Sequence, residues 1–154
     1  MRITPRIMKF GINLWPPFIG AGIRVRRIAP DWGEIDVALR LGLTNRNYVG
    51  VHFGGSLYAM TDPFFMLMLM HRLGRPYFVW DSAGRIEYLK PARGTVVARF
   101  SLDDAFVARL IDDAAAGDKV LPELAVDIVD DAGDVVARVH KTLYVRLKPE
   151  HRPR

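Results

Sequence analysis

The chain of 154 residues contains no cysteine. This absence excludes disulfide scaffolds, thiolate zinc sites, iron–sulfur clusters and cysteine nucleophiles. The four histidines, His52, His71, His140 and His151, do not have the spacing of metal ligands. We therefore predict no metal site, and a structural role is the simpler interpretation of each histidine.

Long hydrophobic runs are also missing. The longest strongly apolar stretch without a charge covers residues 63–70, whereas a membrane-spanning helix needs about 20 residues. The N-terminal residues do not form a convincing secretory signal, because Asn13 and the pair Pro16-Pro17 interrupt the segment after the first basic residues. We therefore predict a cytoplasmic protein without a membrane span.

Acidic residues are absent from the first 30 positions, which carry six of the 22 Lys and Arg residues. The net charge of +5 therefore belongs to the N-terminal segment. Arg24, Arg26 and Arg27 are interleaved with apolar residues, as in a solvated strand face, and no nucleic-acid-binding module accompanies them. We predict no nucleic-acid partner, and the basic segment is either solvated or a partner surface.

Half of the residues are hydrophobic and a quarter are charged, which is typical of a globular domain. We predict a single domain over residues 1–154, with a helical leader at 1–20, a core at about 21–147 and a basic tail at 148–154. Alternating apolar residues predict strands at 23–28, 34–41, 77–80, 85–89, 95–102, 122–129 and 135–147. Helices are predicted from Pro5, with Thr4 as its cap, and over residues 103–116.

The most informative element is a central helix. Residues 64–70 read Phe-Phe-Met-Leu-Met-Leu-Met and are apolar around the whole helix, so neighbours must cover it on nearly every side. One buried helix among about six strands predicts an α+β protein, in which a curved antiparallel sheet wraps around one long apolar helix. That architecture is the hotdog fold.

Residues 47–62 resemble the active-site segment of the hotdog acyl-CoA thioesterases of the phenylacetate-pathway type. The positions that match that family's pattern are Asn47, Gly50, Gly54, Gly55 and Asp62. Residues 88–94 are similar to a strand signature of the same superfamily: an apolar residue, Leu, a basic residue, Pro, Ala, any residue and Gly. The resemblance covers about residues 20–147, and its Phe-Gly-Gly-Ser and Asp-Pro variants resemble a bacterial thioesterase-like branch.

This resemblance implies hydrolysis of an acyl-CoA or a related acyl thioester. The reaction needs a base or nucleophile, and donors aimed at the developing oxyanion. The backbone N–H groups around Gly54 and Gly55 lie where the helix begins, so they are unpaired and at the positive end of its dipole. Asp62 is the only side chain in residues 54–69 that is charged at neutral pH, and a carboxylate on an apolar helix has to be paired or used. We expect Asp62 to act as nucleophile or general base.

The remaining candidates would bind or position the substrate. Asn47 would position the thioester or the water, while Phe53, Ser56 and Thr61 would provide further contacts. Lys90, Arg93 and Arg46 are candidates for the coenzyme A phosphates, although solvated loop charges explain them equally simply. Coenzyme A would enter only as part of the substrate, so no separate cofactor is expected.

Phe53 occupies the position of the family's histidine, and His52 lies one position earlier. Because side chains alternate along an extended segment, His52 is not expected to replace the missing imidazole. The loss favours an alternative function, a hotdog protein that binds an acyl or aryl thioester or a lipid without hydrolysing it. A hotdog dehydratase that uses His52 is less consistent, since the surrounding pattern is missing.

The spacing of the two catalytic elements predicts an oligomer. Gly54 and Asp62 are eight residues apart, which is about 12 Å along a helix. One carbonyl group cannot contact both within hydrogen-bonding distance, so a productive site needs Gly54 of one subunit and Asp62 of another. The resemblance likewise implies dimers with two sites at the interface. We predict a homodimer, with a homotetramer as the alternative.

Simpler interpretations remain for several residues. Asp62 followed by Pro63 is also a standard cap of a helix that begins only at Pro63. The family pattern instead favours a helix from about Gly55 that is kinked at Pro63. Close backbone packing also explains the glycine pair, and the methionines of the apolar helix belong either to the core or to an adaptable acyl pocket.

Overall fold

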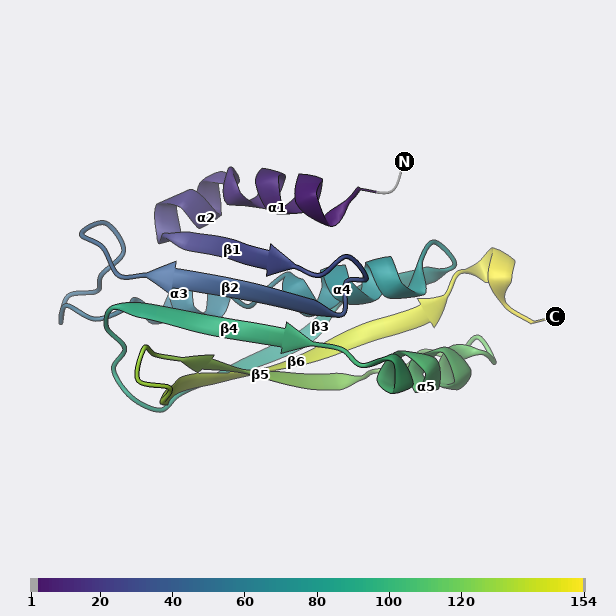
Figure 1. Cartoon of the computed structure of the whole chain (residues 1–154). Helices are drawn as coiled ribbons and strands as arrows, with labels where there is room; N and C mark the ends of the chain where they lie inside the picture. The colour runs from purple at the N-terminus through teal and green to yellow at the C-terminus, as the bar shows by residue number, and fades with distance from the viewer. Residues whose placement is uncertain (1–2, 154) are drawn as a thin grey trace.

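The computed structural model describes residues 3–153 of the chain. Residues 1–2 of the predicted leader and Arg154 of the predicted basic tail lie outside this range. Figure 1 shows a six-stranded sheet with a central helical segment behind it and two further helices along one edge. The predicted α+β architecture is therefore confirmed.

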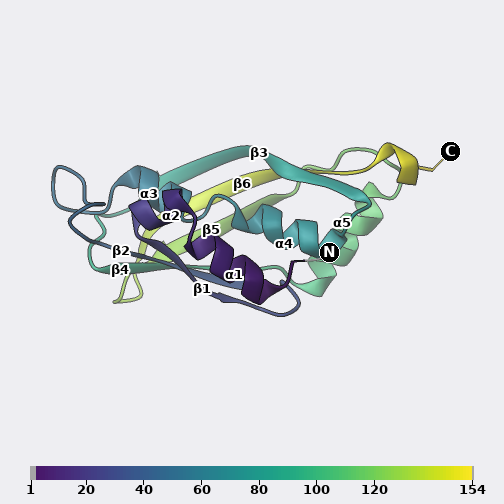
Figure 2. The same ribbon diagram turned by 90° about the horizontal axis from the view of Figure 1, so that it is seen from above.

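One antiparallel sheet contains the six strands, in the order β1-β2-β4-β5-β6-β3. Their bounds are β1 (Ile23–Ile28), β2 (Glu34–Arg40), β3 (Tyr77–Tyr88), β4 (Thr95–Ser101), β5 (Glu123–Val129) and β6 (Val135–Leu147). Seen from above, α4 lies between β3 and β6 on one side and β1, β2 and β4 on the other (Figure 2). The sheet therefore wraps around the central helices and buries its inner face on them.

β3 is one continuous strand, where the sequence predicts two strands at 77–80 and 85–89. A β-bulge at Ser82 shifts its pairing with β6, from Asp81 opposite Leu143 to Gly84 opposite Lys141. Odd-numbered residues face the helices before the bulge, and even-numbered residues face them after it. A pattern with a constant period of two cannot follow such a strand, which is why the sequence divides it.

The helices are α1 (Pro5–Asn13), α2 (Pro16–Ala21), α3 (Gly54–Ala59), α4 (Phe64–Leu73) and α5 (Asp104–Ala114), with a 3₁₀ turn at Pro149–His151. Thr4 caps α1 as predicted, since its side chain accepts the N–H of Ile7. The sequence does not predict α2, because Pro16 and Pro17 end α1; the same prolines then begin α2, since proline fits a first helical turn. None of the helices within residues 3–153 is long and apolar enough to cross a membrane.

The central helical segment is divided into α3 and α4, an interruption larger than the kink predicted at Pro63. Proline lacks an N–H group and clashes with the preceding turn of a helix. The N–H and the hydroxyl of Thr61 both bond to the carbonyl oxygen of Tyr58, at 3.0 and 2.8 Å, and this tight turn ends α3. Asp62 is left in the turn and caps neither helix.

One chain covers most of α4 but not all of it. The buried residues of the helix are Phe64, Phe65, Met68, Leu69 and Leu73. Met66 and Leu67 are half-buried, and Met70 is 46% exposed. The burial on nearly every side that the apolar sequence predicts is therefore incomplete within a single chain.

A lysine interrupts the apolar inner row of β6. The neighbours of Lys141 in this row, Val139 and Leu143, are buried, and the lysine side chain itself is only 2% exposed. Its ammonium Nζ donates to Oδ1 of Asp62 at 2.9 Å and lies 3.4 Å from Oδ2 of Asp81. These contacts join β6, β3 and the turn between α3 and α4.

We predict that Lys141→Met lowers the free energy of unfolding by about 2–3 kcal/mol, because it leaves Asp81 inside the fold without its counter-charge. This value lies below the range for a fully buried ion pair, since Asp62 and part of Asp81 are solvated. Urea unfolding followed by circular dichroism measures the loss. Lys119→Met, at an exposed position, is the control and should change stability by less than about 0.5 kcal/mol; equal losses in the two variants would contradict the prediction.

Candidate active site

The segment that leads into α3 forms a groove with the end of β3 and the residues after it. The groove has a volume of about 530 Å³. Five of the predicted site residues line it: Asn47, Phe53, Gly54, Gly55 and Lys90. Its other lining side chains are mostly apolar, so the groove combines a glycine-rich helix start with a surface suited to an acyl or aryl group.

Gly54 and Gly55 are the first two residues of α3, so their N–H groups have no acceptor within the helix. A Cβ atom on Gly54 would lie 2.9 Å from the Tyr88 hydroxyl oxygen, and one on Gly55 would lie 2.5 Å from the Phe53 ring. The close packing that explains this pair structurally is therefore present. The space that side chains would take at these two positions is filled by the Tyr88 and Phe53 rings.

Asn47 holds the loop before the groove. Its Oδ1 accepts the N–H groups of Val49 and Val51, both at 3.1 Å, and its Nδ2 donates to the carbonyl oxygen of His52 at 3.4 Å. The side chain therefore fixes the loop from which the helix starts. A contact with substrate would have to share an amide that already bonds to the loop.

His52 and Phe53 differ sharply in exposure, as the alternation of side chains predicts. His52 is 3% exposed and Phe53 is 57% exposed. Nε2 of His52 lies 3.0 Å from the carbonyl oxygen of Gly94, so Nε2 carries the proton and donates. Its Nδ1 is buried with no partner among residues 3–153. Burial lowers the pKa of His52, and the ring is neutral near pH 7.

The predicted phosphate-binding cations differ in their contacts. Lys90 donates to Asp130 and Asp134, at 2.8 and 2.6 Å, and these hydrogen bonds raise the pKa of its ammonium. Arg93 donates to the carbonyl oxygen of Gly50 at 2.9 Å. Arg46 is exposed, and its backbone forms an isolated β-bridge with that of His52. All three cations belong to the groove or to the loops next to it.

Ser56 and Thr61 are buried and are not among the residues that line the groove. Thr61 is fully enclosed, and its hydroxyl is used in the turn that ends α3. The structure therefore separates these two predicted contacts from the glycine groove of the same chain.

Asp62 lies outside the glycine groove of its own chain. Its side chain is 56% exposed, and its Oδ1 accepts from Lys141. No hydrogen bond from another residue of the described chain reaches its second oxygen. The carboxylate is thus paired on one side and accessible to solvent on the other.

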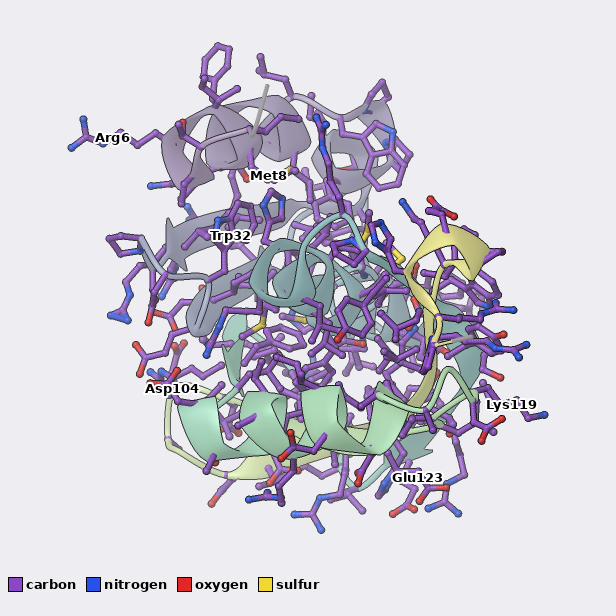
Figure 3. The ribbon with its side chains drawn as sticks, turned by 90° about the vertical axis from the view of Figure 1, so that its right-hand side faces the viewer. Arg6, Met8, Trp32, Asp104, Lys119 and Glu123 are labelled. Carbon is purple, nitrogen blue, oxygen red and sulfur yellow. The ribbon has the colours of Figure 1, made fainter. Side chains whose placement is uncertain are left out.

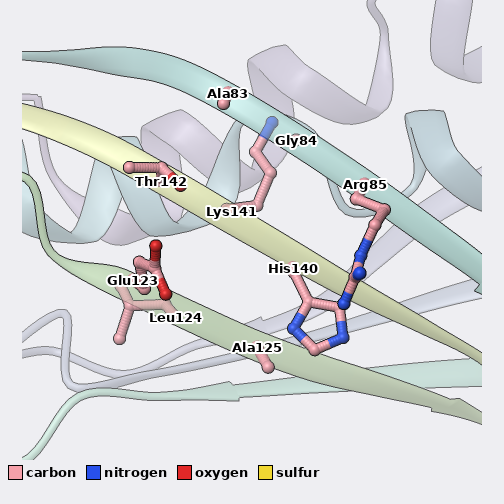
Figure 4. Close-up of a pocket in the computed structure, with 9 residues that line it drawn as sticks. All are labelled: Ala83, Gly84, Arg85, Glu123, Leu124, Ala125, His140, Lys141 and Thr142. Atoms are coloured by element: carbon pink, nitrogen blue, oxygen red, sulfur yellow. The ribbon is translucent and has the colours of Figure 1, made fainter.

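Two residues of this cluster are not predicted from the sequence: Lys141, which contacts Asp62, and Asp81, which contacts Lys141. A signal for Lys141 was available, because the alternation of β6 places position 141 in the inner row. The bulge at Ser82 hid the inward position of Asp81. In Figure 4 the Lys141 amine ends beside Gly84, whereas the ring of its neighbour His140 lies beside Arg85; these residues line a groove formed by β3, β5 and β6.

The charges in this cluster influence one another. Burial raises the pKa of Asp81, although the positive charge of Lys141 opposes the change. Burial alone would lower the pKa of Lys141, but its hydrogen bond with Asp62 and the two negative charges outweigh it and raise that pKa. Lys141 is therefore a cation at neutral pH.

We predict that stability falls as the pH is lowered from about 8 to about 5, in part because of His52. Burial lowers the pKa of His52 in the folded state, so as the pH falls the unfolded chain binds a proton at this histidine before the folded chain does. The free energy of unfolding that His52 contributes is therefore largest above about pH 6.5 and decreases below it. His52→Gln keeps a donor for Gly94 but does not titrate. The urea midpoints of the two proteins should therefore diverge between these pH values, whereas parallel pH profiles would show that His52 contributes nothing.

Comparisons with known proteins support this description of the fold. A family model described as "Domain of unknown function (DUF4442)" matches residues 4–145. A search of curated proteins finds no significant match. A structure of a Pseudomonas aeruginosa protein of unknown function, described as a probable thioesterase, has a TM-score of 0.81 at 19% identity, and the match covers 96% of this chain and 99% of that one.

Two further solved structures have the same fold. A thioesterase from Haemophilus influenzae has a TM-score of 0.69 at 17% identity, with 98% of this chain and 96% of that chain covered. A mutant of the phenylacetic acid degradation protein PaaI from Thermus thermophilus has a TM-score of 0.59 at 24% identity, with 86% and 100% covered. Together these similarities confirm the predicted hotdog fold. Since the family model covers residues 4–145 of this hotdog protein, the chain belongs to the DUF4442 family.

Proposed function

We propose that the protein hydrolyses an acyl-CoA or a related acyl thioester. The observation that carries the proposal is the state of Asp62, a carboxylate that is more than half exposed and is held by a buried lysine. Similar structures described as thioesterases, together with the glycine groove, support the same reaction.

Each group of the proposed site would have one role in the hydrolysis. The N–H groups of Gly54 and Gly55 would stabilise the negative charge that develops on the thioester oxygen. Asp62 would attack the carbonyl carbon directly or remove a proton from the attacking water. The hydrogen bond from Lys141 holds one oxygen of the Asp62 carboxylate, so the other oxygen could face the substrate.

The site is completed by a second subunit in this proposal. Within one chain Asp62 does not line the glycine groove, and the described residues leave its accessible side facing solvent. Apolar residues of α4 also remain partly uncovered in a single chain. Association into a homodimer, or a tetramer built from dimers, would bring the Asp62 of one subunit to the groove of the other.

The groove also suggests how a substrate would lie. Leu57, Leu89 and Ala92 provide apolar contacts for an acyl or aryl group. Lys90, which lines the groove, and Arg93 and Arg46, in the loops next to it, would bind the phosphates of coenzyme A. Coenzyme A belongs to the substrate here, so the reaction needs no separate cofactor.

We expect purified protein to release free thiol from at least one member of a panel of short, long and aromatic acyl-CoAs. Asp62→Asn should lower kcat by at least about a hundredfold, since it removes the base or nucleophile. Asp127→Asn is the matched control, because Asp127 also forms an ion pair at the surface, with Arg138. Full activity in Asp62→Asn, or an equal loss in the control, would contradict the assigned role.

A mixing experiment tests the shared site. Asp62→Asn and Gly55→Val should each be inactive alone. In Gly55→Val the new side chain should cover the N–H groups, and the residue that it contacts, Phe53, is exposed and has room to move. A heterodimer of the two variants contains one intact site, so an equal mixture should recover about a quarter of the wild-type rate. No recovery in a mixture shown to contain heterodimers would place the whole site in one chain.

Binding without hydrolysis is the second candidate function. Two observations favour it. The ion pair with Lys141 occupies one oxygen of Asp62. An exposed phenylalanine, Phe53, stands at the position of the histidine in the phenylacetate-pathway thioesterases. The same panel separates the two functions. Tight binding of an acyl-CoA by wild type with no release of thiol would support binding alone, whereas turnover that depends on Asp62 supports the hydrolase.

A further inference from the structure

The outward face of α1 is apolar and uncovered. Ile7, Phe10 and Leu14 follow one another at intervals of three and four residues, which places them within about 60° of one another around the helix. Phe10 is 70% exposed, and more than half of Ile7 and of Leu14 is exposed. Trp15 and Ile19 extend the exposed apolar surface into α2. We call this set of five residues the α1 surface.

The helix that carries this surface is held firmly on the protein. Met8 and Ile12, on its other side, pack against the core, and Figure 3 shows Met8 beneath the helix. Asn13 bonds twice to Val25 of β1: its Nδ2 donates to the carbonyl oxygen at 3.0 Å, and its Oδ1 accepts the N–H at 2.8 Å. These bonds occupy the otherwise open edge of the sheet. The apolar side chains are therefore presented by a fixed helix.

Basic side chains border the α1 surface. Arg6, Lys9 and Arg24 line a groove of about 430 Å³ together with Phe10 and Leu14. Figure 3 shows Arg6 reaching away from the side of the helix. The groove therefore places three positive charges directly beside two exposed apolar side chains.

The positive charge continues onto the outer face of the sheet. Arg24 also lines a neighbouring groove of about 600 Å³, together with Arg26 and Arg40. Within residues 3–153 none of the cations in these two grooves forms an ion pair, and no acidic residue occurs before Asp31. The region thus has unneutralised charge of one sign next to exposed apolar groups.

We infer that the α1 surface docks on a membrane that contains anionic phospholipids. A phospholipid presents its phosphate next to its acyl chains, and this region presents its cations next to Ile7, Phe10 and Leu14. An amphipathic helix of this kind lies in the interface, with its apolar side at the boundary of the acyl chains and its cations among the phosphates. The docking does not depend on the proposed hydrolysis, and it gives a function to the basic N-terminal segment.

A second copy of the chain fits the same surface less well. Two copies that met through α1 would bring the unpaired cations of both grooves together without any negative charge between them. An anionic bilayer supplies the apolar environment and the counter-charges at once. Charge complementarity therefore selects the lipid surface.

Vesicle sedimentation with the full-length protein tests the inference. We expect binding at low salt to vesicles of phosphatidylglycerol and phosphatidylcholine, and little binding to phosphatidylcholine alone. Arg6→Glu combined with Lys9→Glu should lower the partition coefficient on the order of thirtyfold. The control combines Arg109→Glu with Lys119→Glu, which changes the net charge equally on exposed positions; Figure 3 shows Lys119 far from α1. This control should bind as wild type does.

A second matched pair tests the apolar contribution. Ile7→Ser removes an exposed isoleucine from α1, and Ile111→Ser removes one from α5. We expect the first to weaken vesicle binding by about tenfold and the second to have no effect. Thermal unfolding by circular dichroism should show that all variants are folded, since the changed side chains are exposed.

Several results would overturn the inference. Equal binding to neutral and anionic vesicles, or equal losses in a variant and its control, would show that the α1 surface is not the lipid contact. Absence of vesicle binding by wild type, with a smaller oligomer in Ile7→Ser on analytical ultracentrifugation, would instead identify α1 as an interface between copies. Thiol release is measured separately, so failure of docking is distinguishable from failure of the proposed hydrolysis.

Discussion

The buried ammonium of Lys141 is the constraint on which the central part of the structure depends. A charged group in the inner row of a sheet is tolerated only when opposite charges and hydrogen bonds reach it. Asp81 reaches it from the bulge of β3, and Asp62 reaches it from the turn between α3 and α4. One buried cation therefore links the strand that pairs with β6 to the break in the helix that the sheet surrounds.

The same interaction connects the fold to the proposed chemistry. Residues 60–63 form a turn between α3 and α4, and Asp62 lies in this turn. Its side chain is partly exposed, and one of its oxygens accepts a hydrogen bond from Lys141. The glycine groove forms separately, where α3 begins. Under the proposed function, each chain would provide N–H donors for a thioester at the groove and a carboxylate, Asp62, that does not line that groove. In the proposed mechanism a second chain would combine them, and the partly exposed residues of α4 leave surface for such a contact.

Local patterns in the sequence were enough to predict most of the elements. β1 and β6 have the predicted bounds because their apolar residues alternate regularly, and α1 begins at the predicted cap. The sequence predicts two strands in place of β3 because the bulge at Ser82 changes which residues face the helices. It predicts only a kink at Pro63 because the end of α3 depends on the hydrogen bonds of Thr61 to the Tyr58 carbonyl oxygen. The glycine groove followed from a resemblance in motif. Lys141 and Asp81 were missed because their importance depends on a contact between residues far apart in the chain.

The N-terminal segment and the proposed catalytic elements lie in different regions of the molecule. α1 covers the β1 edge of the sheet and directs apolar and basic side chains outward, whereas the glycine groove and Asp62 belong to the central helices. Their functions can therefore be tested independently.

The most direct test of the shared site is a crystal structure with an acyl-CoA analogue in which a methylene group replaces the thioester sulfur. We predict that its carbonyl oxygen accepts the N–H groups at Gly54 and Gly55 of one subunit while Asp62 of the other faces the carbonyl carbon. A carbonyl group bound away from these glycines, or next to Asp62 of the same chain, would contradict the shared site.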